Sequence, residues 1–183
     1  MVDFRQARWF GFNTQVYSLC CPALDDNEVT SLYDFTLGRN PDPQGLNFGI
    51  SMLARGRSMN QLEANLLGSN EFFQQQSGNS NKTYLTNVYL AALQRFPDPG
   101  SSVYLDELNS GVSRTTVATT ILDSTEASMV TVDNLYLAFL GRQADPGAQG
   151  YINMLHQSRG AALNQVVVDI TTSNEFISRA TTG

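Results

Sequence analysis

The chain repeats one pattern of residues three times along its 183 positions. A hydrophobic–Tyr pair is followed six residues after the Tyr by an Arg, and three residues after the Arg by an Asp-Pro pair. An aromatic residue, a Gly, and a Ser-x-Glu motif come next. Self-similarity with a period of about fifty residues is typical of a repeated supersecondary unit, and such units usually build extended surfaces. The key positions are Tyr33, Arg39, Asp42 and Glu71, then Tyr89, Arg95, Asp98 and Glu126, then Tyr136, Arg142, Asp145 and Glu175.

The spacing of apolar residues within each copy predicts helices. Leu85, Val88, Tyr89, Ala92 and Leu93 follow the i, i+3, i+4, i+7, i+8 pattern of one helix face, so a first helix ends near the Arg. A second helix is predicted to start at the Asp-Pro, because Asp caps helices well and Pro is favoured at the first helical position. It stops at the Gly, which adopts the left-handed conformation readily. A third helix follows, and a short fourth helix begins at the Ser-x-Glu.

The sequence therefore predicts an all-α fold, a helical bundle built from three related repeats of about three to four short helices each. The predicted repeats cover residues 25–77, 81–129 and 131–179. A polar stretch at 77–81 separates the first two, and the second junction, at 129–131, is tight. Residues 1–24 lie outside the pattern and are predicted to form an irregular, aromatic-rich N-terminal arm that contains Trp9, Phe10, Phe12 and Tyr17.

Residues 37–45, with the sequence L-G-R-N-P-D-P-Q-G, resemble a known motif when taken with the later Gly and Ser-x-Glu-Phe. The motif belongs to a family of domains of unknown function that is related to phycobilisome linker domains and is found as repeats in bacterial surface and secreted proteins. The resemblance covers residues 28–178. The second repeat departs from it, since Gln94 replaces the Gly before the Arg and Ala127 replaces the Phe after the Glu. The resemblance implies an all-α scaffold or interaction module and implies no enzymatic activity.

The charge of the chain argues against nucleic acids and anionic membranes as partners. The net charge is −6, with no cluster of Lys and Arg, and both partners require a basic patch. No apolar run approaches the roughly 20 residues that span a bilayer, so membrane insertion is not expected. Asp3, Arg5 and Arg8 interrupt the start of the chain, which therefore lacks the apolar core of a secretory signal. Any export is expected to use another route.

The common catalytic and metal-binding motifs are missing from the sequence. His156 is the one histidine, and the chain holds no HExxH, GxSxG, P-loop or CxxC pattern. Asn40, Asp42, Gln44 and Gly45 resemble the opening of an EF-hand loop, but Ser51 stands where that loop needs a bidentate Glu. We therefore predict a protein that is not an enzyme and that has no cofactor and no metal site.

The repeated Arg allows two interpretations. It either closes a corner between helices, paired with the nearby Asp or with the Ser-x-Glu carboxylate, or it binds a ligand together with the Asp. We predict the structural role for Arg39, Arg95 and Arg142, because a residue present in every repeat usually belongs to the framework. If the pairs are buried, Arg142→Ala should cost about 3–5 kcal/mol because it would strand a paired carboxylate, whereas a surface Arg would be available for binding.

Taken together, these patterns predict a non-enzymatic structural and protein–protein interaction module in a larger assembly, such as a surface layer, a virion or tail, or a linker-type scaffold. The predicted partners are other protein subunits, held through the arm residues Trp9, Phe10, Phe12 and Tyr17, because desolvated aromatic anchors dominate interface energetics. The alternative is a ligand-binding adhesin module that recognises glycan or calcium at a cell surface. An extracellular, cell-surface or virion location is favoured over the cytoplasm.

Overall fold

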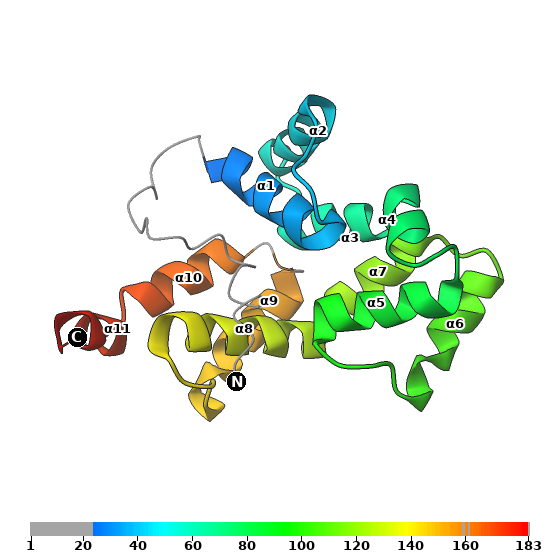
Figure 1. Ribbon diagram of the computed structural model, residues 1–183. Helices are drawn as coiled ribbons and strands as arrows, with labels where there is room; N and C mark the ends of the chain where they lie inside the picture. Colours follow the sequence, from blue (N-terminus) through cyan, green and yellow to red (C-terminus); the bar gives the residue numbers. More distant parts are fainter. Residues whose placement is uncertain (1–23, 159, 161, 183) are drawn as a thin grey trace.

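The computed structural model describes residues 24–158, 160 and 162–182, and every regular element in that part of the chain is helical (Figure 1). The predicted all-α fold is confirmed. The helices are α1 (Leu24–Leu37), α2 (Pro43–Ala54), α3 (Met59–Leu67), α4 (Asn70–Gln75), α5 (Asn81–Leu93), α6 (Ser102–Asn109), α7 (Arg114–Leu122), α8 (Thr125–Leu140), α9 (Gln149–Ser158), α10 (Leu163–Thr171) and α11 (Asn174–Thr182). Two short 3-10 helices, η2 (Pro99–Ser101) and η3 (Pro146–Ala148), precede α6 and α9.

Side chains that cap the helices explain where most of these elements begin. Ser58 and Gln61 form a capping box at the start of α3, and Ser69 accepts a hydrogen bond from the backbone N–H of Phe72 in α4. Asp42 caps α2, which begins at Pro43 as predicted. In the later two copies the Asp-Pro opens a 3-10 turn instead, and the α-helix follows it.

The same pairs of helices pack against one another in successive segments of the chain. Helix α1 contacts α2, α3 and α4, while α5 contacts α6, α7 and α8. Helix α8 in turn contacts α9, α10 and α11. The first turn of α8 packs on α5 as α4 packs on α1. The remainder of α8 contacts α9, α10 and α11 as α1 contacts α2, α3 and α4. Helix α8 therefore runs unbroken through residues 129–131, where the sequence analysis placed a junction.

The buried apolar residues that the structure describes form two clusters rather than one per predicted repeat. The first extends from Val29 to Ala127 and joins helices of both the first and the second segments. The second, which includes Val132, Leu135 and Ile170, lies between α8, α9 and α10. Within the first cluster, Tyr84 is fully buried and donates a hydrogen bond to the carbonyl of Arg114 at 2.8 Å.

The crossing of α3 and α7 joins the first two segments. Asn60, at the start of α3, donates a hydrogen bond of 3.1 Å to the carbonyl of Leu122, at the end of α7. Gly68, just after α3, lies against Thr115 at the start of α7. The two helices therefore run antiparallel. A Cβ atom at Gly68 would fall 2.7 Å from the backbone nitrogen of Thr115, so the crossing requires a residue without a side chain.

The residue directly before each repeated Arg has a left-handed backbone conformation, and in the second copy this residue is not glycine. Gly38 and Gly141 have φ of 69° and 62°, and Gln94, at the equivalent position, has φ of 54°. A side chain in this conformation is disfavoured by about 1 kcal/mol. Gln94, where the other two copies have Gly, therefore leaves local strain in the second segment.

We predict that Gln94→Gly raises the free energy of unfolding by about 0.5–1 kcal/mol, since it removes that strain. Urea denaturation followed by circular dichroism measures the change. Gly38→Ala is the matched control, because its Cβ would meet no atom within 4 Å and only the backbone conformation would be strained. The control should be destabilised. A Gln94→Gly protein less stable than wild type would show that the Gln side chain makes a compensating contact.

Candidate functional site

The three repeated Arg residues each bind the Glu of their own Ser-x-Glu motif through two hydrogen bonds. Arg39 donates from Nε to Glu71 Oε1 at 2.5 Å and from Nη2 to Oε2 at 2.7 Å. Arg142 binds Glu175 with the same atoms at 2.6 Å and 2.7 Å, and Arg95 binds Glu126 in the same manner. A carboxylate matches the fork of a guanidinium group in this geometry. We call each set of Tyr, Arg and Glu a corner.

The Tyr of each corner lies under the guanidinium group. Arg39 is 5.5 Å from the ring centroid of Tyr33, and the corresponding distances are 5.2 Å at Tyr89 and 5.0 Å at Tyr136. These are cation–π contacts. The left-handed residue between the end of the helix and the Arg turns the chain back over the ring. The six-residue spacing between Tyr and Arg follows from this arrangement.

The aspartates of the Asp-Pro pairs have two roles in the fold. Asp98 and Asp145 each accept from Nη1 of the Arg three residues earlier, at 2.9 Å. Asp145 also accepts from the backbone N–H of Gly147 at 2.7 Å, and Asp42 from that of Gly45 at 2.7 Å. The sequence analysis left the partner of the Arg open between Asp and Glu. The structure pairs all three Arg with Glu and two of them also with Asp.

These pairs are partly exposed, so the large cost that applies to buried pairs is not expected here. The Arg side chains are 36–37% exposed, and the Glu side chains are 28–44% exposed. The corners lie at helix ends on the surface, where salt screens ion pairs. Hydrogen bonds from the Arg are the main reason that the pKa of Glu71, Glu126 and Glu175 lies below its usual range. The stability that the corners contribute is therefore lost as the pH falls through these lowered pKa values.

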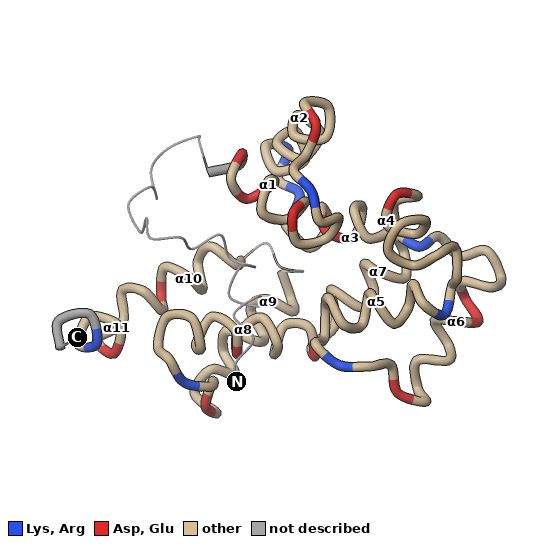
Figure 2. Tube along the Cα trace, in the orientation of Figure 1, with Lys and Arg blue, Asp and Glu red and all other residues tan. Residues whose placement is uncertain are grey.

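Charged residues outside the corners are distributed along the described part of the chain. Figure 2 shows Lys and Arg spaced along the trace rather than gathered in one run. The described residues hold no group of three or more His, Cys, Asp and Glu side chains arranged to bind a metal ion. No helix in the same part of the chain is both long and apolar enough to cross a bilayer. The predicted interface residues Trp9, Phe10, Phe12 and Tyr17 lie outside the described residues.

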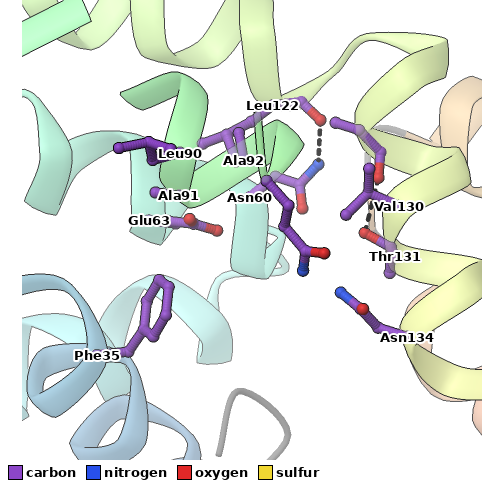
Figure 3. Close-up of a pocket in the computed structure, with 12 residues that line it drawn as sticks. Phe35, Asn60, Glu63, Leu90, Ala91, Ala92, Leu122, Val130, Thr131 and Asn134 are labelled. Carbon is purple, nitrogen blue, oxygen red and sulfur yellow. Dashed lines mark hydrogen bonds between the residues drawn. The ribbon is translucent and has the colours of Figure 1, made fainter. Parts of the chain in front are cut away.

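A second candidate site, which the sequence analysis did not single out, surrounds Glu63 of α3. Its side chain is 1% exposed, and within the described part of the chain neither carboxyl oxygen has a hydrogen-bond partner. Burial raises the pKa of Glu63 to about 8, so the group is mostly protonated at neutral pH. Beside it is a pocket of about 110 Å³ between α1, α3, α5, α7 and α8 (Figure 3).

The middle of the chain matches a known protein family. Residues 63–131 match the family described as a domain of unknown function (DUF4214). This segment runs from Glu63 in α3 to Thr131 in α8 and includes the whole second corner, with Tyr89, Arg95 and Glu126. The resemblance to a domain of unknown function is supported over that segment. No curated protein and no solved structure matches the chain.

Proposed function

We propose that the protein is a non-enzymatic structural and protein–protein interaction module of a larger assembly. The corners are the main support for this proposal. At each one, the Arg and Glu that recur in the sequence bind each other within the chain and hold two helix ends together. The recurring polar residues thus serve the framework. The exposed surface outside the corners is proposed to make the specific contacts with partners.

Large apolar side chains on that surface support a role in protein contacts. Phe96, directly after the second corner's Arg, is 71% exposed, and Val103 of α6 is 53% exposed. Phe48, Met129 and Leu137 are each about half exposed. Aromatic and Met side chains are enriched at protein interfaces relative to the rest of the surface. The acidic net charge suits partners that are proteins rather than nucleic acids.

The N-terminal arm is the proposed anchor to neighbouring subunits. Trp9, Phe10 and Phe12 lie close together in the sequence, and aromatic anchors in desolvated pockets supply much of the energy of an interface. The proposed partners are other protein subunits. The proposed settings are a surface layer, a virion or tail, or a linker-type scaffold related to phycobilisome linkers, with an extracellular or cell-surface location. The aspartates on which calcium or glycan binding would rely already cap helices or pair with Arg.

Size-exclusion chromatography with light scattering tests the proposal. The full chain and a chain that starts at Asp25 are compared over a range of concentrations. We expect the full chain to exceed the monomer mass at high concentration and the shortened chain to remain monomeric. If both chains stay monomeric throughout, assembly through the arm is contradicted.

A further inference from the structure

Glu63 is a buried acidic group that the framework does not use. It lies on α3 near the crossing with α7, and Figure 3 shows its carboxyl group among the residues that line the pocket. Neither oxygen has a hydrogen-bond partner among the residues that the structure describes. A buried polar group without a partner costs free energy. A ligand that supplies a hydrogen-bond donor would recover that cost, so the pocket is suited to a donor ligand.

The other residues that line the pocket limit the kind of ligand that it could bind. Asn60, Gln94, Thr131 and Asn134 provide amide and hydroxyl oxygens, and apart from Glu63 the other described residues that line the pocket are apolar. The described lining contains no Lys, Arg or His, so none of the described cations neutralises Glu63 there. A single water needs roughly 10–15 Å³ on the same measure of volume. The pocket of about 110 Å³ therefore has room for a small organic group.

We propose that this pocket binds a primary alkylammonium group, with Glu63 as the counter-ion. An ammonium group carries three donors, which match a carboxylate and neighbouring amide oxygens. Its alkyl stem suits the apolar wall formed by Leu90, Leu122 and Val130. The group could come from a free small amine or from a lysine side chain of another protein. The proposal is separate from assembly through the arm.

Binding requires deprotonation of the Glu63 carboxyl group and a small movement of its side chain. The proton of the Glu63 carboxyl passes to solvent, and the carboxylate then pairs with the ammonium ion. The oxygens are sealed from solvent in this structure, so the side chain must rotate to meet the ligand. The residues that face Glu63 across the pocket from α1, α5, α7 and α8 are uncharged. Asn60, which also lines the pocket, donates a hydrogen bond to the carboxylate of Asp123 at 3.3 Å.

Titration with n-butylamine, followed by NMR chemical-shift changes, tests the proposal, and 1-butanol serves as the uncharged comparison. Because the raised pKa of Glu63 is about 8, the apparent affinity for butylamine should rise about tenfold per pH unit from pH 6 to pH 7.5 and then level off. E63Q should weaken binding at pH 8 at least tenfold and remove the pH dependence. D106N, which removes an exposed carboxylate on α6, should bind like the wild type. Nα-acetyl-lysine methylamide tests whether a lysine side chain is also accepted.

A second measurement does not depend on any variant. Calorimetric titration at pH 7 in buffers of different ionisation enthalpy should show release of about one proton for each butylamine bound. The proposal is overturned if butylamine does not bind at pH 8, if 1-butanol binds as well as butylamine, or if E63Q keeps wild-type affinity. Binding without proton release at pH 7 would likewise exclude Glu63 as the counter-ion.

Discussion

Replacement of Glu63 by Gln should make the free energy of unfolding nearly constant between pH 5 and pH 8, whereas that of the wild type should fall by about 3–4 kcal/mol. The reason is the raised pKa of about 8 that burial gives this carboxyl group, against an ordinary value of 4.5. Between the two values the folded protein retains a proton that the unfolded chain has released. The unfolded state is therefore favoured more as the pH rises, and the loss is complete above the folded-state pKa.

Urea denaturation at several pH values between 5 and 8.5 measures this effect. The corner carboxylates have lowered pKa values, so their contribution to stability changes only at acidic pH and does not affect the slope between pH 5 and pH 8.5. Asp106→Asn is the matched control, because it removes one exposed carboxylate on α6 and should retain the slope of the wild type. A wild-type stability that is flat across this window would show that Glu63 is ionised and paired in the folded protein.

Gly68→Ala should destabilise the protein by about 2–3 kcal/mol through overpacking at the crossing of α3 and α7. The added Cβ would lie 2.1 Å from Oγ1 of Thr115 and 2.7 Å from both its backbone nitrogen and its Cα. Because two of these atoms belong to the backbone, rotation of a side chain cannot relieve the contact. The two helices must separate, and the first hydrophobic cluster spans both.

Thermal melts and urea denaturation of Gly68→Ala, alone and combined with Thr115→Ala, test this account. The combined variant should recover only the small part of the loss that is due to Oγ1. Gly150→Ala in α9 is the control, since its Cβ meets no atom within 4 Å and Ala favours a helix. The control should be as stable as the wild type or slightly more so. Recovery of full stability in the combined variant would show that the backbones move apart easily.

Local signals in the sequence predicted the helices and much of the corner. Ser69 and Asp42 cap helices where the sequence indicated a start, and Gly56 adopts the left-handed conformation predicted for the end of α2. These features depend on residues that are close together in the chain. The choice of Glu71 over Asp42 as the partner of Arg39 depends on how α4 lies against α1, which spacing alone does not specify.

Features that depend on long-range packing could not be predicted. Glu63 follows Leu62 in what looks like an ordinary amphipathic helix, and its burial arises only because other helices close around α3. The unbroken course of α8 was also missed. The stretch at 129–131 contains neither Gly nor Pro, so nothing stops a helix there once both of its ends pack.

Comparison of the wild type with a variant in which Trp9, Phe10 and Phe12 are all changed to Ala tests the central claim most directly. Mass by light scattering and Tm by circular dichroism are measured on the same samples. The account predicts that the variant is monomeric at concentrations where the wild type assembles, while its Tm stays within a few degrees of the wild-type value. Burial of each ring at an interface should contribute on the order of 2 kcal/mol to assembly. A variant that unfolds, or one that assembles as the wild type does, would contradict the claim that the arm joins a self-sufficient bundle to its neighbours.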